Sequence, residues 1–130
     1  MAAAVTVPKL TRITRIALWV NAVLHFLGSL GMILGLDPNA AAEPMMARRA
    51  GVPAVAAFVM FVLVSRRIER DPALIALPWS FVLCNFGDTI YEFATSRDPH
   101  FLAPAIPEAT FLVLYSIFAV SFLRRRATRV

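Results

Sequence analysis

Three polar residues stand at helical spacing in the stretch NFGDTIYEF, residues 85 to 93 of this 130-residue chain. Asn85, Asp88 and Glu92 are separated by three and four residues, so a helix would place all three on one face. Two carboxyl groups whose surroundings favour different protonation states can act as a general acid and a general base. The pattern indicates acid–base chemistry, provided that the helix holds these side chains away from water.

Further polar residues lie on other apolar segments. Asn21 and His25 are four residues apart, and Glu108 and Tyr115 are seven apart, so each pair shares a helix face. Histidine can exchange a proton near neutral pH. We therefore predict as catalytic residues Asp88, Glu92 and His25. The predicted substrate-binding residues are Asn21, Asn85, Tyr115, Glu108, Phe81, Arg48 and Arg49, with the aromatic rings able to stabilise developing positive charge.

The composition determines which elements position these residues. The chain is 59% hydrophobic with a mean hydropathy of +0.71, and a soluble domain of this length cannot bury that much apolar surface. Four apolar stretches suit helices across a hydrocarbon core of about 30 Å. We predict an all-α fold, a single integral membrane domain over residues 1–130 with a four-transmembrane-helix bundle at about 16–36, 50–65, 72–94 and 105–123.

The basic residues predict the orientation of this bundle. Ten of the thirteen Lys and Arg residues precede the first span, separate the second from the third, or follow the fourth. The positive-inside rule then places both termini in the cytoplasm, in a multi-pass protein of the cytoplasmic (inner) membrane. Blocks of cations beside apolar runs argue against a nucleic-acid partner. Ala40, Ala41 and Ala42 resemble a signal-peptidase site, but the preceding apolar stretch exceeds the usual 7 to 15 residues, so we expect the first span to be retained.

With this orientation, the polar residues fall at overlapping depths in the outer half of the membrane. A charge near the bilayer centre costs at least about 2.5 kcal/mol, so these side chains should face one another in a polar pocket that opens outward. The alternative is structural. Asp88 or Glu92 would pair with the arginines at 48 and 49, while Asn21 and His25 would form interhelical hydrogen bonds of about 0.6 kcal/mol each. Gly28, Gly31 and Gly35 would allow a neighbouring helix to approach the first one closely.

Other chemistries find little support. The single cysteine, Cys84, excludes an internal disulfide and a CxxC redox pair. No HExxH or Gly-rich phosphate motif is present, and we predict neither a metal nor a cofactor.

The segments LGMILGLDP, ARRAG and SRRIERDP, followed by the polar third helix, resemble the small four-helix bacterial membrane proteins grouped as DoxX-like. This resemblance implies a four-helix bundle in a bacterial cytoplasmic membrane. In architecture alone, acidic residues in a helical pocket are also similar to sterol isomerases of the emopamil-binding type and to small membrane terpene cyclases.

Three functional hypotheses follow from these residues. The first is a membrane-embedded acid–base enzyme, an isomerase, cyclase or epoxide-opening catalyst, that acts on a lipophilic small molecule. The second is a non-enzymatic accessory subunit or assembly factor of a larger membrane complex. The third is a proton-coupled carrier, which would need a homodimer because one chain has few helices. Expected partners are membrane lipid and a hydrophobic ligand.

Overall fold

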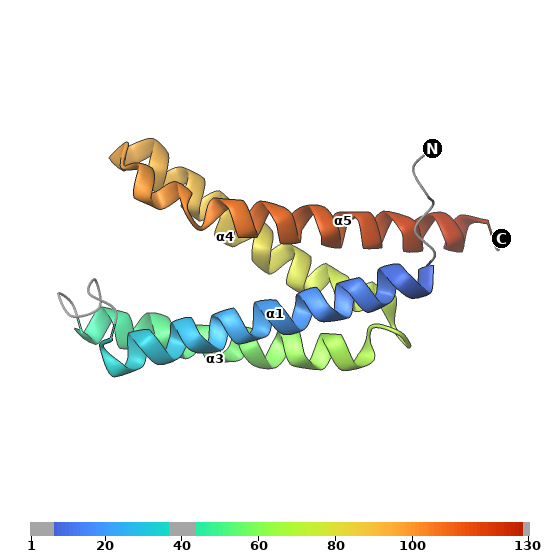
Figure 1. The fold of residues 1–130 in the computed structure, drawn as a ribbon, viewed down its shortest axis with the longest axis horizontal. Coiled ribbons are helices and arrows are strands. Elements are labelled where there is room, and N and C mark those ends of the chain that lie inside the picture. Colours follow the sequence, from blue (N-terminus) through green and yellow to red (C-terminus); the bar gives the residue numbers. More distant parts are fainter. Residues whose placement is uncertain (1–6, 37–43, 129–130) are drawn as a thin grey trace. The chain divides into compact units, whose positions relative to one another are not determined.

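The computed structural model describes residues 7–36 and 44–128, which form helices and short connections with no strand. In chain order the elements are α1 (Val7–Leu34), α3 (Pro44–Arg67), the 3-10 helix η1 (Pro72–Ile75), α4 (Ala76–Ser96), the 3-10 helix η2 (Pro99–Leu102) and α5 (Ala105–Ala127) (Figure 1). The all-α prediction is confirmed for this part of the chain.

Three segments of the described chain are long and apolar enough to cross a membrane: Pro8–Leu34, Pro72–Ser96 and Ala105–Ala127. Large apolar side chains are exposed on each of them, for example Leu27, Leu77 and Ile106. Water would penalise such a surface, whereas lipid solvates it. The chain is therefore compatible with an integral membrane protein. The identity of the membrane and the cytoplasmic location of the termini stay predictions.

The chain divides into two compact units, one made of Met1–Thr14 and Arg67–Val130, the other of Arg15–Arg66. A single membrane domain over residues 1–130 stays a prediction.

The first unit contains the hairpin of α4 and α5, which run side by side (Figure 1). Pro72 stands in the first turn before α4, where its missing N–H leaves no helical hydrogen bond unmade. Arg97 caps the end of α4, where it adopts a left-handed backbone conformation (φ 60°) and donates its N–H to the Phe93 carbonyl at 2.8 Å. Asp98 then caps η2 by accepting the His100 backbone N–H at 2.9 Å. These local signals turn the chain back so that α5 can pack against α4.

The second unit pairs α1 with α3 in antiparallel directions. The rings of Phe26 and Phe58 lie 5.2 Å apart between their centroids, and Gly51 on α3 contacts Ile33 on α1. A Cβ atom at Gly51 would lie 2.7 Å from Ile33 Cγ1, so glycine is required for this close approach.

The sequence predicts close helix packing at Gly28, Gly31 and Gly35. At Gly28, Gly31 and Gly35 a Cβ atom would meet no described residue within 4 Å. Within the residues that the structure describes, the close helix contact is therefore made through Gly51 on α3, and close packing at Gly28, Gly31 and Gly35 stays a prediction.

The helix boundaries correct the sequence prediction in two places. α3 runs from Pro44 to Arg67, longer than the expected 50–65, and α1 starts at Val7 instead of residue 16. Both extensions consist largely of polar, basic or small residues that hydropathy excludes, although arginine and alanine are good helix formers. At 1.5 Å per residue, the 24 residues of α3 extend about 36 Å. The third and fourth helices continue to Ser96 and Ala127, slightly beyond the expected 94 and 123.

Candidate functional site

The hairpin of α4 and α5 brings two of the predicted acidic residues together. Glu108 lies in the first turn of α5, and its carboxyl group interacts electrostatically with Asp88 on α4. The hydroxyl of Thr89, a residue only 8% exposed, is hydrogen-bonded to the same carboxyl group. Glu108 Oε2 is buried and has no hydrogen-bond partner among the described residues. The Glu108 carboxyl group thus has a buried oxygen with no described partner, and it lies within electrostatic range of the exposed Asp88.

Neighbouring carboxyl groups are the arrangement in which one group carries a proton while the other is ionised. A buried oxygen without a partner costs about 1–3 kcal/mol or more, so a stable fold would normally satisfy it. The geometry therefore suits proton donation by one carboxyl group and proton acceptance by the other.

Aromatic side chains pack within the same hairpin. Tyr115 on α5 is fully buried and stacks on Phe111, with ring centroids 6.1 Å apart. Trp79 on α4 donates from Nε1 to Ser116 Oγ at 2.9 Å, which satisfies the indole N–H within an apolar hairpin. The Trp79–Ser116 hydrogen bond joins α4 to α5, and the stacked rings of Phe111 and Tyr115 add apolar surface on α5.

The remaining predicted residues of α4 lie on a less buried face. Phe81 and Asn85 are half-buried, whereas Asp88 and Glu92 are exposed. The buried residues of α4 are Pro78, Val82 and Thr89. That Asp88 and Glu92 face an enclosed pocket stays a prediction.

In the second unit, Asn21 is buried and His25 is half-buried on α1. His25 Nδ1 lies 2.8 Å from the Asn21 carbonyl oxygen, which can only accept, so Nδ1 carries the proton in the neutral ring. The ring also packs on Phe61 of α3 at a centroid distance of 5.2 Å. The Nδ1 contact is made to the backbone of Asn21, so a joint role of the Asn21 and His25 side chains stays a prediction. That they join the carboxyl groups of the hairpin stays a prediction.

The backbone of Arg48 and Arg49 belongs to α3, but their side chains lie outside the described residues. The predicted pairing of these arginines with Asp88 or Glu92 stays a prediction. Among the described residues, His, Cys, Asp and Glu do not gather in a group of three or more that could hold a metal ion.

Sequence reasoning missed Thr89 and the Trp79–Ser116 contact. Thr89 stands seven residues after Val82, which puts both on the buried side of α4. The seven-residue spacing could therefore have identified Thr89 as a buried residue. Their partners Glu108 and Ser116 lie on another helix, so no local pattern predicts that Thr89 pairs with Glu108 or Trp79 with Ser116.

No protein-family model, curated protein or solved structure matches this chain.

Proposed function

We propose that this chain is an integral membrane protein that carries out acid–base chemistry on a lipophilic small molecule. The observation that carries this proposal is Glu108, whose Oε2 is buried and unpartnered while Thr89 and Asp88 adjoin the same carboxyl group. A group that weakens the fold in this way is a candidate for function. The apolar helices around it favour a substrate that partitions into lipid.

In this proposal Glu108 is the general acid and Asp88 is the general base. Glu108 gives its proton to an oxygen or a double bond of the substrate, and Asp88 removes one from the resulting electron-poor intermediate. Isomerisation and cyclisation use this pair of transfers, and in epoxide opening the base instead takes a proton from the attacking nucleophile. Thr89 orients the acid, and the buried Tyr115 provides an aromatic surface for developing positive charge. Glu92 and His25 are proposed as further proton acceptors.

The first test needs no known substrate. A protonated carboxyl group and a carboxylate absorb at different infrared frequencies, so difference spectra of the purified protein report the acid directly. We expect a protonated-carboxyl band that is absent in Glu108→Gln and retained in Glu69→Gln. Glu69 is a suitable control because it is an exposed acid in the connection after α3. Identical bands in all three proteins would exclude Glu108 as the acid.

The second test identifies the substrate and measures turnover. Lipids extracted from the purified protein are identified by mass spectrometry, and candidate molecules are assayed. We expect Glu108→Gln to lower kcat about a hundredfold or more, Thr89→Val to lower it less, and Glu69→Gln to leave it unchanged. Full turnover by Glu108→Gln would refute the catalytic assignment.

A second candidate function is that of a subunit in a larger membrane complex. Asp88 and Glu92 are exposed on a helix that is apolar enough to cross a membrane, and a charge facing lipid costs about 2.5–3.5 kcal/mol near the bilayer centre. A cationic or hydrogen-bonding partner would relieve this cost. Native mass spectrometry after mild extraction distinguishes the two functions, since a subunit copurifies with a partner that Asp88→Asn and Glu92→Gln release.

A further inference from the structure

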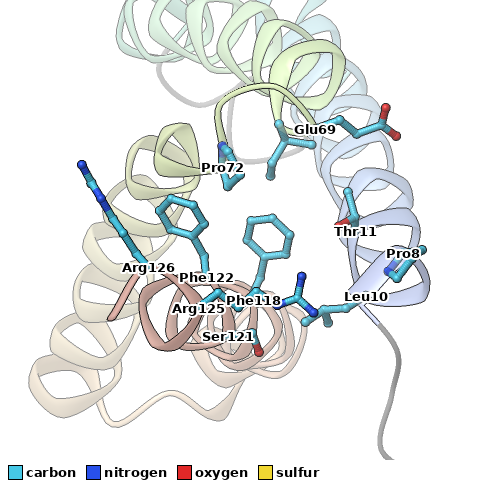
Figure 2. Close-up of a pocket in the computed structure, with 11 residues that line it drawn as sticks. Pro8, Leu10, Thr11, Glu69, Pro72, Phe118, Ser121, Phe122, Arg125 and Arg126 are labelled. Atoms are coloured by element: carbon cyan, nitrogen blue, oxygen red, sulfur yellow. The ribbon is translucent and has the colours of Figure 1, made fainter. Parts of the chain in front are cut away.

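A cavity of about 620 Å³ lies in the first unit, at the opposite end of α5 from Glu108 (Figure 2). Phe118 stands ten positions after Glu108 on the helix, which corresponds to about 15 Å along the axis. The cavity is therefore a second feature, separate from the carboxyl pair. Its lining includes Leu10, Ile68, Pro72, Phe118, Phe122 and Arg125.

The larger part of the lining of this cavity is apolar. Ile68 and Phe118 are buried, and Figure 2 shows the rings of Phe118 and Phe122 directed toward the side that carries Pro72. A volume of this size accommodates part of a flexible hydrocarbon chain.

Charge at the edge of the cavity is positive. Figure 2 shows Arg125 reaching from α5 toward the side on which Leu10 lies, whereas Arg126 and the Glu69 carboxylate point away from the two rings. Neither Arg125 nor Arg126 makes an ion pair with a residue that the structure describes. Five more cations of this unit lie close in sequence to the residues that line the cavity: Lys9, Arg12, Arg67, Arg70 and Arg124.

We propose that this cavity binds an anionic phospholipid of the surrounding bilayer. An acyl chain would contact Phe118 and Phe122, and the phosphate would accept hydrogen bonds from the Arg125 guanidinium. The occupant is a lipid because a largely apolar cavity adjoins Arg125, a cation that forms no ion pair with a described residue, at the end of a helix that is apolar enough to span the membrane. This inference is independent of the proposed acid–base function.

The test titrates the full chain, in a nonionic detergent, with two probes that share their acyl chains: dioleoyl phosphatidylglycerol and dioleoyl phosphatidylcholine. Native mass spectrometry gives the affinity for each. We expect tighter binding of phosphatidylglycerol. Arg125→Gln should weaken that binding about fivefold and leave phosphatidylcholine unchanged, as the loss of one basic contact predicts.

Arg124→Gln is the matched control, because it removes the same charge from a neighbouring exposed residue that does not line the cavity. It should keep most of the preference for phosphatidylglycerol. Equal losses in Arg124→Gln and Arg125→Gln would show diffuse attraction to the basic surface and would overturn the proposal. Equal affinity of the unmodified chain for both lipids would also overturn it.

A second pair of variants tests the apolar half of the site. Phe122→Ala should weaken phosphatidylglycerol binding, while Leu123→Ala, at an exposed position outside the cavity, should not. Circular dichroism and size-exclusion chromatography establish that each variant is folded. If soluble glycerol phosphate competes as strongly as the lipid, the site recognises a free phosphate and the lipid assignment is wrong.

Discussion

Two carboxyl groups of the first unit differ in what surrounds them. Asp98, in the connection after α4, accepts hydrogen bonds from the His100 backbone N–H at 2.9 Å and from the His100 ring at 2.8 Å. Glu108, at the start of α5, has a buried oxygen without a described partner. At the residue scale, Asp98 is thus a cap whose charge is stabilised by His100. Glu108 has an oxygen that is still able to form a hydrogen bond.

The pKa of Asp98 lies below its ordinary value of 3.8, chiefly because the His100 backbone N–H binds the ionised carboxylate and secondly because the His100 side chain does. A lowered pKa means that ionised Asp98 stabilises the folded connection above pH 3.8. This contribution is lost as the pH falls through the lowered pKa of the folded protein.

An NMR titration of the Asp98 carboxyl carbon in detergent micelles measures this pKa. We expect a midpoint below 3.8, with the larger part of the lowering retained in His100→Ala because the backbone donor remains. A midpoint at or above 3.8 in the unmodified protein would contradict the cap.

At the element scale, the pairing of α1 with α3 depends on one missing side chain. Gly51 lies against Ile33, and a Cβ atom there would also come within 3.3 Å of the Ser29 carbonyl oxygen. The Ile33 side chain is β-branched and has restricted rotamers in a helix, so it cannot move aside easily. The separation of the two helices is therefore set at this position.

Gly51→Ala should destabilise the second unit by about 1–3 kcal/mol, although alanine favours helices more than glycine does. Gly28→Ala is the matched control on α1, where a Cβ atom meets no described residue within 4 Å. It should be neutral or stabilising by up to about 1 kcal/mol. Thermal unfolding in detergent measures both. A destabilised Gly28→Ala with an unchanged Gly51→Ala would reverse this assignment of the helix contact.

At the scale of the whole molecule, composition and charge act together. Three apolar segments are long enough to cross a membrane, and α4 and α5 are joined by only eight residues, from Arg97 to Pro104. If both helices span, this connection and the C-terminal end of α5 lie on opposite sides of the membrane.

Labelling of single cysteines tests this arrangement. Cys84→Ala removes the single native cysteine. His100→Cys and Thr128→Cys are then introduced separately and treated with an impermeant maleimide in intact cells. We expect His100→Cys to react and Thr128→Cys to be protected until the membrane is opened. Reaction of both positions in intact cells would exclude a spanning hairpin, and the reverse pattern would invert the predicted orientation.

The helical character of this chain, its membrane compatibility and the approximate positions of its helices could be predicted from the sequence. These properties depend on hydropathy and local backbone preference, and both are summed over neighbouring residues. The ends of α1 and α3 were missed because helices continue through polar and basic residues that hydropathy does not count. The prediction that Asp88, Glu92 and His25 share one pocket stays a prediction.

The contacts that matter for function depended on tertiary structure. Thr89 meets Glu108 and Trp79 meets Ser116 across the hairpin, and Gly51 meets Ile33 across the second unit. The sequence determined the approximate position of each helix. Only the tertiary structure decided which face of each helix meets its neighbour. That face is selected by the fit between side chains on two helices, and the sequence of one helix does not specify the side chains that it will meet.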